Sequence, residues 1–262
     1  MDEKKILKIK EAIKRNFEES PDKYEAFETK YGFFGALNSA LLQELKIRSN
    51  PRVLDIGCGT GASSIQILES IPESNVWGLD NSPAMLAIAR KNNPSPLRLK
   101  FIEGDAGAIT NYIKQKMDII IYSASIFLIP DYRQSLHQAW ELLNPGGALG
   151  LTYMVGVLED GGQNAFVCAD ERAQTNVSQK KPVEFDSLTL FLKDLFSNVT
   201  AHAKDFICDI EMLRAFFSIP AMSAGLYPSL VYEDRLRMLE TLFSHLRCDK
   251  MSFRWNLVTA LK

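Results

Sequence analysis

The feature that most constrains the fold of this chain is an apolar segment that runs directly into three alternating glycines. Arg52–Ile56 has the composition of a buried strand, and Gly57, Gly59 and Gly61 precede a helical pattern at Ala62–Ser70. Glycine permits positive φ and lets a ligand approach the backbone closely. The helix that follows presents unpaired N–H groups at its first turn. The segment therefore predicts a strand, a tight loop and a helix that together form a ligand-binding turn.

Alternation between short apolar runs and helical patterns continues over residues 51–155. Such alternation is typical of βαβ units, in which crossover helices join parallel strands. Further strands are expected at Asn75–Leu79, Leu97–Glu103, Asp118–Tyr122 and Ala148–Met154. Further helices are expected at Ser82–Lys91 and Tyr132–Leu143. These elements predict a mostly parallel sheet with one core, formed by residues 51–156.

The segments on either side of this core have different patterns. Residues 1–50 predict helices that close over the core, and Ile6, Ile9, Ile13 and Phe17 recur at helical spacing. Residues 157–250 predict a mostly helical cap that forms the substrate region, including a run of helical spacing from Phe206 to Phe217. Residues 251–262 are again typical of a strand, so the chain is expected to return to the sheet.

Composition excludes several classes of function. The chain has 262 residues, 46% of them hydrophobic, with a formal net charge of −2, so no basic face for nucleic acid is expected. An apolar run long enough to cross a bilayer is missing from the sequence, which predicts no membrane association. The cysteines lie far apart, without the spacing of metal ligands, at Cys58, Cys168, Cys208 and Cys248. We therefore expect a cytoplasmic protein without a metal site.

Acidic residues occur at three successive ends of the expected strands. Asp55 precedes the glycine loop, Asp80 ends the second apolar run, and Asp105 follows the third. The glycines have the spacing GxGxG, one residue shorter than the GxGxxG pattern that binds a dinucleotide pyrophosphate. A carboxylate beside the turn suits a cationic ligand better than a pyrophosphate. A carboxylate at the second strand can accept both hydroxyls of a ribose, and one at the third strand can face an adenine amino group.

Taken in order, the motifs VLDIGCGTG, GLDNS, FIEGDA, MDIIIYSASIFLI and LLNPGGAL resemble the class I S-adenosylmethionine-dependent methyltransferases. The resemblance covers residues 51–155 and is strongest toward the small-molecule branch of that family. It implies an α/β fold, with a Rossmann-like, doubly wound, mostly parallel sheet, helices on both faces and a mostly helical cap. It also implies methyl transfer to a small-molecule acceptor by direct in-line displacement, with S-adenosyl-L-methionine as cofactor and S-adenosyl-L-homocysteine as product.

The same resemblance implies roles for particular residues. The glycines and Asp55 would hold the methionine part of the cofactor, Asp80 its ribose and Asp105 its adenine. The full set of implied cofactor contacts is Asp55, Gly57, Cys58, Gly59, Gly61, Asp80, Asn81, Met85, Asp105, Ala106, Tyr122 and Ser123. Tyr122 and Phe127 depart from the family, because many relatives have small or polar residues there. The fourth strand therefore predicts a more aromatic substrate site than usual.

No catalytic residue is assigned by the sequence. The candidates are Tyr31 before the first strand, Tyr153 at the end of the fifth expected strand, and His202 in the cap. The chain is expected to act as a monomer or homodimer. Two alternatives stay open. One is a non-catalytic S-adenosylmethionine-binding regulatory protein. The other is a nicotinamide-dependent oxidoreductase, which the early third glycine and the position of Asp55 disfavour.

Overall fold

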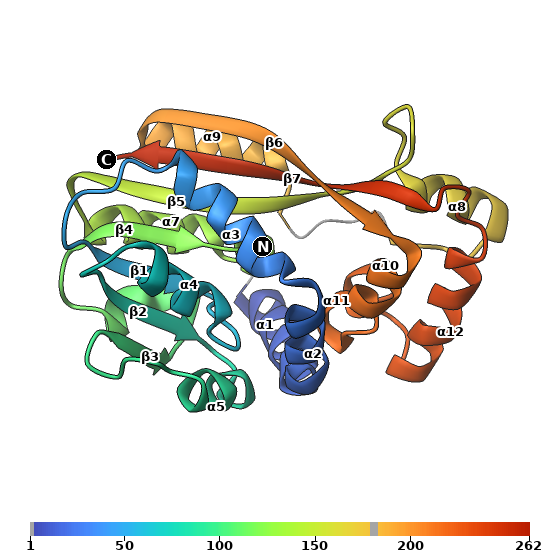
Figure 1. The fold of residues 1–262 in the computed structure, drawn as a ribbon, viewed down its shortest axis with the longest axis horizontal. Coiled ribbons are helices and arrows are strands. Elements are labelled where there is room, and N and C mark those ends of the chain that lie inside the picture. The colour runs from blue at the N-terminus through green and yellow to red at the C-terminus, as the bar shows by residue number, and fades with distance from the viewer. Residues whose placement is uncertain (1–2, 179–182) are drawn as a thin grey trace.

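The fold is built on one seven-stranded sheet, as the computed structural model shows for residues 3–178 and 183–262 (Figure 1). The strand order is β3-β2-β1-β4-β5-β7-β6. The first five strands run parallel, whereas β7 is antiparallel to both β5 and β6. The strands are β1 Arg52–Ile56, β2 Asn75–Asp80, β3 Leu99–Glu103, β4 Met117–Tyr122, β5 Leu143–Leu158, β6 Ser197–Asp209 and β7 Lys250–Leu261.

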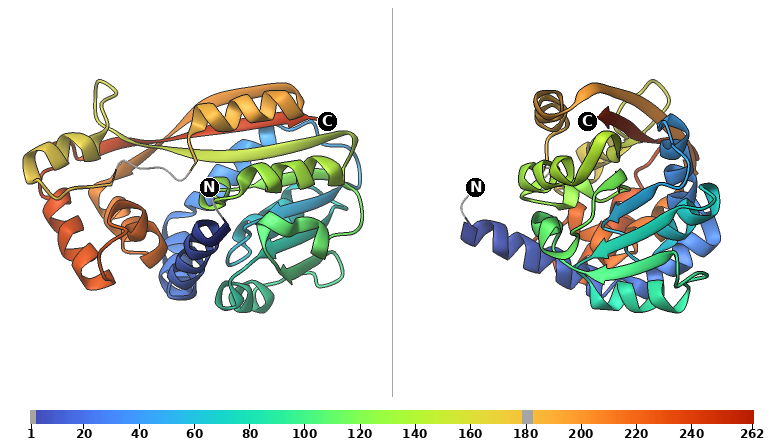
Figure 2. Two further views of the ribbon diagram at one scale, coloured as in Figure 1. Left: turned by 180° about the vertical axis from the view of Figure 1, so that it is seen from behind. Right: turned by 90° about the vertical axis from the view of Figure 1, so that its left-hand side faces the viewer.

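Helices cover both faces of the sheet, as the two further views show (Figure 2). Before the sheet come α1 Glu3–Glu18, α2 Pro21–Tyr31 and α3 Phe33–Glu44. Between the parallel strands lie α4 Ala62–Ser70, α5 Pro83–Lys91, α6 Ile109–Tyr112 and α7 Tyr132–Leu142. The remaining helices are α8 Ala165–Ala173, α9 Phe185–Leu195, α10 Ile210–Phe217, α11 Pro220–Leu226 and α12 Tyr232–Phe243. The architecture is the doubly wound α/β arrangement that the sequence predicted.

The central strands are buried on both faces because their side chains alternate between two apolar cores. Ile119 and Ile121 of β4 belong to the core that includes residues of α3 and α4, whereas Ile120 belongs to the core on the opposite face, which includes residues of α7. In β1, Val53 and Leu54 divide between the two cores in the same way. A strand buried on both faces needs an uninterrupted apolar run, which explains why the sequence located β1 and β4 to within one residue.

The strands β5, β6 and β7 extend beyond the parallel part of the sheet and carry the cap (Figure 1). The pairing of β5 with β7 reaches from Ala148 to Leu158. Helices α8, α10, α11 and α12 lie around the far ends of these strands, and α1 and α2 lie between them and the sheet core. Helix α1 therefore lies beside the carboxyl ends of β1, β2 and β4 (Figure 1).

One strand departs from the helical pattern expected for residues 157–250. Strand β6, Ser197–Asp209, pairs only with β7, and most of its residues are exposed. An edge strand exposed on much of its length lacks the alternation of apolar and polar residues by which a strand is located in a sequence. The run of helical spacing that starts at Phe206 therefore begins too early, since Phe206 and Ile207 belong to β6 and α10 begins at Ile210.

No helix within the described residues is long and apolar enough to cross a membrane.

Candidate active site

The glycine loop after β1 forms one wall of a cavity of about 90 Å³. Gly57 has φ 75°, and a Cβ added there would lie 2.5 Å from Cβ of Ser125. Ser125 is held in place because its hydroxyl donates to the carbonyl oxygen of Ile56 at 2.5 Å. Gly59 also has positive φ but faces open space. Glycine is thus required at 57 both by the backbone conformation and by the close approach of the loop after β4.

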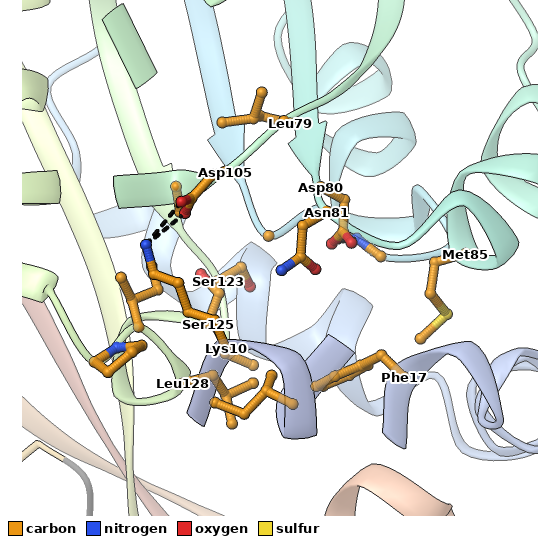
Figure 3. Close-up of a pocket in the computed structure, with 18 of the residues that line it drawn as sticks. Lys10, Phe17, Leu79, Asp80, Asn81, Met85, Asp105, Ser123, Ser125 and Leu128 are labelled. Carbon is orange, nitrogen blue, oxygen red and sulfur yellow. Dashed lines mark hydrogen bonds and ion pairs between the residues drawn. The ribbon is translucent and has the colours of Figure 1, made fainter. Parts of the chain in front are cut away.

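Asp80 stands at the end of β2, beside the glycine loop (Figure 3). One carboxylate oxygen accepts the N–H of Gly59 at 2.9 Å, and the other accepts the N–H of Ser82 at 2.9 Å. Burial raises the pKa of this carboxyl group, although the backbone hydrogen bonds oppose the rise. These hydrogen bonds aim the carboxylate, and its remaining lone pairs face the cavity that it lines.

Asp105, after β3, is paired with a lysine from the N-terminal helix (Figure 3). Nζ of Lys10 lies 3.0 and 2.7 Å from the two oxygens of Asp105 and 2.6 Å from an oxygen of Asp131. Burial disfavours the charge of Lys10, but the hydrogen bonds to the two carboxylates outweigh it, so its pKa is raised. The carboxylate expected to face an adenine amino group therefore has a cationic partner in this structure.

Four of the implied cofactor contacts lie outside the lining of this cavity. Asp55 is fully buried and accepts the hydroxyls of Ser63 at 2.5 Å and Ser64 at 2.7 Å, at the start of α4. Cys58 is buried against α5. Gly61 has φ 85° and lies beneath the ring of Phe101. The phenol of Tyr122 forms a hydrogen bond with Ser135 at 2.8 Å.

The other implied contacts do come together around the cavity. Those that line it are Gly57, Gly59, Asp80, Asn81, Met85, Asp105, Ala106 and Ser123. Sequence reasoning did not assign Lys10, Ile13 or Phe17 of α1, or Met222 of α11, which also line it. The helical spacing of Ile13 and Phe17 was the available signal, because an apolar stripe on a helix must contact something. Nothing in the local sequence of Met222 pointed to this place.

A second and larger cavity, of about 170 Å³, adjoins the first. Ala124, Leu128 and Met222 line both cavities. In addition, Tyr24 of the first cavity stacks on Phe34 of the second, with ring centroids 4.7 Å apart. The second cavity is enclosed by β5, β7, α8, α10 and α11, so it lies between the sheet and the cap.

The three candidate catalytic residues occupy different places. Tyr153 lines the second cavity, and its hydroxyl donates to the carbonyl oxygen of Val183 at 2.7 Å. Burial raises the pKa of Tyr153 to about 12. Tyr31 packs against Phe27 at a ring distance of 5.1 Å, outside the described lining of both cavities. His202 is exposed on the edge strand β6, also outside the described lining.

The part of the chain that the structure describes holds no group of three or more His, Cys, Asp or Glu residues able to bind a metal ion.

Comparison with known proteins places this site in a wider context. Residues 53–147 match the family model described as a methyltransferase domain. Trans-aconitate 2-methyltransferase of Deinococcus radiodurans is 33% identical over 132 residues, which cover 50% of this chain and 48% of that protein. Carboxy-S-adenosyl-L-methionine synthase of Klebsiella pneumoniae is 31% identical over 154 residues, covering 54% and 62%. The matched region thus spans about half to three fifths of these relatives.

The fold is also similar to that of solved structures. The YcgJ protein of Bacillus subtilis superimposes with a TM-score of 0.62 at 16% identity, covering 87% of this chain and 98% of that one. At this level of identity the similarity concerns the fold alone.

Proposed function

We propose that this chain, whose residues 53–147 match a methyltransferase domain, is a class I S-adenosylmethionine-dependent methyltransferase that transfers a methyl group to a small-molecule acceptor. The observation that carries the proposal is the pair of adjoining cavities. The first is lined by the glycine loop and by Asp80, and the second opens toward the cap. An enzyme that transfers a group from one small molecule to another needs two binding sites that share a boundary.

The residues of the first cavity fit the proposed cofactor in their chemistry. Gly57 and Gly59 line the cavity without side chains, so a ligand can approach their backbone, and Asp80 offers carboxylate oxygens to ribose hydroxyls. Ile13, Phe17 and Met85 form apolar walls suited to an adenine ring. When bound, S-adenosylmethionine supplies a methyl group activated by its positively charged sulfur.

The residues of this chain contribute to the reaction by aligning the cofactor with the acceptor and by excluding water. The side chains shared by the two cavities are those of Ala124, Leu128 and Met222, and these described residues carry no titratable group. The rate enhancement would therefore come chiefly from holding the cofactor and the acceptor in the geometry of reaction, so that the reaction no longer depends on a bimolecular encounter. Tyr153 is the candidate catalytic residue whose place suits contact with the acceptor, and its raised pKa keeps the phenol protonated at neutral pH.

Calorimetric titration with S-adenosylhomocysteine, run beside NAD, tests the cofactor part of this proposal. We expect the thioether to bind and NAD not to bind. In Asp80→Ala the affinity should fall roughly ten- to hundred-fold, because hydrogen bonds to a charged group are worth about 1.5–3 kcal/mol. Asp22→Ala, at an exposed position of α2, is the matched control and should leave the affinity unchanged.

Other outcomes favour the alternatives. Binding of NAD alone would overturn the proposal in favour of an oxidoreductase. Binding of S-adenosylhomocysteine without methyl consumption across a broad acceptor screen would support a non-catalytic binding protein. Circular dichroism melts of each variant separate loss of binding from loss of the fold.

A further inference from the structure

The second cavity is lined mostly by apolar residues, and eight of its 21 described lining residues carry aromatic rings. Phe127, Tyr153 and Trp255 form one connected group, with Phe127 centred 6.0 Å from Tyr153 and 5.9 Å from Trp255. Rings from α10 and α8 also line the cavity. None of the described residues that line this cavity is Asp, Glu, Lys, Arg or His. Aromatic walls favour an aromatic ligand, because ring edges and faces attract one another.

Trp255 places one hydrogen-bond donor, its indole N–H group, among the apolar lining of this cavity. Its side chain is 1% exposed and lines the cavity, and its indole Nε1 has no hydrogen-bond partner within the described structure. The ring is held by neighbours, among them Phe253 at 5.5 Å between centroids. A buried N–H group without a partner is costly, so such groups are rare unless a ligand or water completes them.

The second cavity adjoins the first, so a molecule bound in it would lie next to the occupant of the first cavity. Ala124, which lines both cavities, has φ 52° although it is not glycine, and its N–H donates to Oγ1 of Thr152 at 2.7 Å. This hydrogen bond holds the loop after β4 in a conformation that non-glycine residues rarely adopt. The loop thus stays at the boundary between the two cavities.

We propose that the methyl acceptor is a neutral aromatic molecule with a hydrogen-bond acceptor oxygen that pairs with the indole N–H of Trp255. The inference rests on the proposed function in taking the occupant of this cavity as the acceptor. An anionic acceptor is disfavoured because a carboxylate here would lose its hydration without meeting a cation among the described lining residues. Lys10, the cation of the first cavity, is already paired with Asp105 and Asp131.

Two nearly isosteric probes separate neutral from anionic occupants. Full-length protein saturated with S-adenosylhomocysteine is titrated with 2-naphthamide and with 2-naphthoate. The amide should bind at least about ten-fold more tightly than the carboxylate, since only the carboxylate loses hydration of a full charge. Equal affinities, tighter binding of the carboxylate, or binding of neither probe would overturn the assignment. Trans-aconitate, a tricarboxylate, should not compete with the amide.

Variants establish where the amide binds. Gly225 is an exposed residue of α11 that lines the cavity, and a Cβ added there meets no atom within 4 Å, so Gly225→Leu should narrow the cavity without strain and weaken binding. Ala224→Leu is the matched control on the same helix, outside the described lining, and should keep the affinity. An unchanged affinity in Gly225→Leu would contradict the proposal.

The role of Trp255 requires a separate comparison. Trp255→Phe keeps a ring and removes the N–H group. It should weaken 2-naphthamide roughly two- to ten-fold, the range expected for one hydrogen bond, while leaving naphthalene within about two-fold. Equal effects on both ligands would show that the residue acts by packing alone.

These tests remain informative if the proposed function fails. Affinity for S-adenosylhomocysteine is measured on every variant and reports on the first cavity alone. If the wild-type protein does not bind S-adenosylhomocysteine, the proposed function is overturned. If it binds S-adenosylhomocysteine but does not prefer the neutral probe, only the assignment of a neutral acceptor is overturned.

Discussion

At the residue scale, Asp55, Asp80 and Asp105 hold similar positions relative to their strands but have different surroundings. Asp55 is enclosed and accepts two serine hydroxyls, whereas Asp80 is half-buried and accepts two backbone N–H groups. Asp105 is the most open, with 40% of its side chain exposed and Lys10 as partner. These differences support the proposal that Asp80 contacts the ligand whereas Asp55 supports the loop, because only Asp80 of this pair lines the first cavity.

Asp55 makes the stability of the protein depend on pH. Burial raises the pKa of its carboxyl group from 3.8 to about 6, although hydrogen bonds from Ser63 and Ser64 oppose the rise. The folded state therefore holds a proton on Asp55 between about pH 4 and pH 6, where the unfolded chain has lost it. The free energy of unfolding must then decrease as the pH rises through this window, by roughly 3 kcal/mol for this carboxyl group.

Asp55→Asn tests this pH dependence, because the amide does not ionise and its oxygen can still accept both hydroxyls. The free energy of unfolding of wild type relative to Asp55→Asn should be lower at pH 7 than at pH 4 by roughly 3 kcal/mol. Urea denaturation at the two pH values measures the difference. Asp22→Asn, at an exposed site, should show no such change. The prediction is contradicted if the Asp55 difference is the same at both pH values.

At the element scale, α1 is the helix most directly tied to the first cavity. Lys10 and Phe17 point toward that cavity (Figure 3), and Ile13 also lines it. At the end of the helix, Glu18 accepts the hydroxyl of Ser82 at 2.7 Å. Helix α1 is amphipathic and packs against the helices α5 and α11. Its stability is therefore expected to depend on what occupies the cavity beneath it.

Hydrogen exchange along α1 should respond to cofactor binding. With saturating S-adenosylhomocysteine, amide exchange over residues 6–17 should slow roughly ten-fold or more, because the ligand adds contacts that opening of the helix would break. Exchange in α9, which lies outside the described lining of both cavities, should stay unchanged. Mass spectrometry of peptides from the two helices gives both values. Equal responses in α1 and α9 would exclude a specific role for α1.

At the scale of the whole molecule, segments from opposite ends of the chain are joined beside the first cavity. The N–H of Ala221 donates to the hydroxyl of Ser20 at 3.1 Å. The guanidinium of Arg235, which is 9% exposed, donates to the carbonyl oxygen of Leu230 at 2.8 Å. It also donates to the side chain of Asn16 at 3.3 Å. The N-terminal helix and the cap thus form one unit beside the first cavity.

Removal of the Arg235 guanidinium should cost stability because it leaves the partly buried carbonyl oxygen of Leu230 and the side-chain oxygen of Asn16 without this donor. We expect Arg235→Met to lower the free energy of unfolding by about 1–3 kcal/mol. Arg237→Met on the same helix removes an exposed ion pair with Asp234 and should cost less than about 0.5 kcal/mol. Urea denaturation of both variants measures the difference. Equal costs would mean that the link between the N-terminal helix and the cap contributes little.

The sequence predicted the core of the fold closely, but the edge of the sheet poorly. Strand β1 has the expected bounds, and β2 and β4 differ from expectation by one residue each. These strands can be located from the local sequence, because a strand that is buried on both faces needs a continuous apolar run. Strand β6 was missed because its stability comes from pairing with β7, a partner about 50 residues away in the chain, as in the pair Phe206 and Phe253.

What the sequence by itself determined is the glycine loop and the carboxylate beside it. Gly57, Gly59 and Asp80 sit next to one another because parallel strands place their carboxyl ends at one edge, a rule that needs no further information. Only the tertiary structure decided that Lys10 and Met222 join them, and that Trp255 faces an apolar cavity. These residues come from segments separated by more than 200 positions, and their meeting depends on how helices and cap pack rather than on any local pattern.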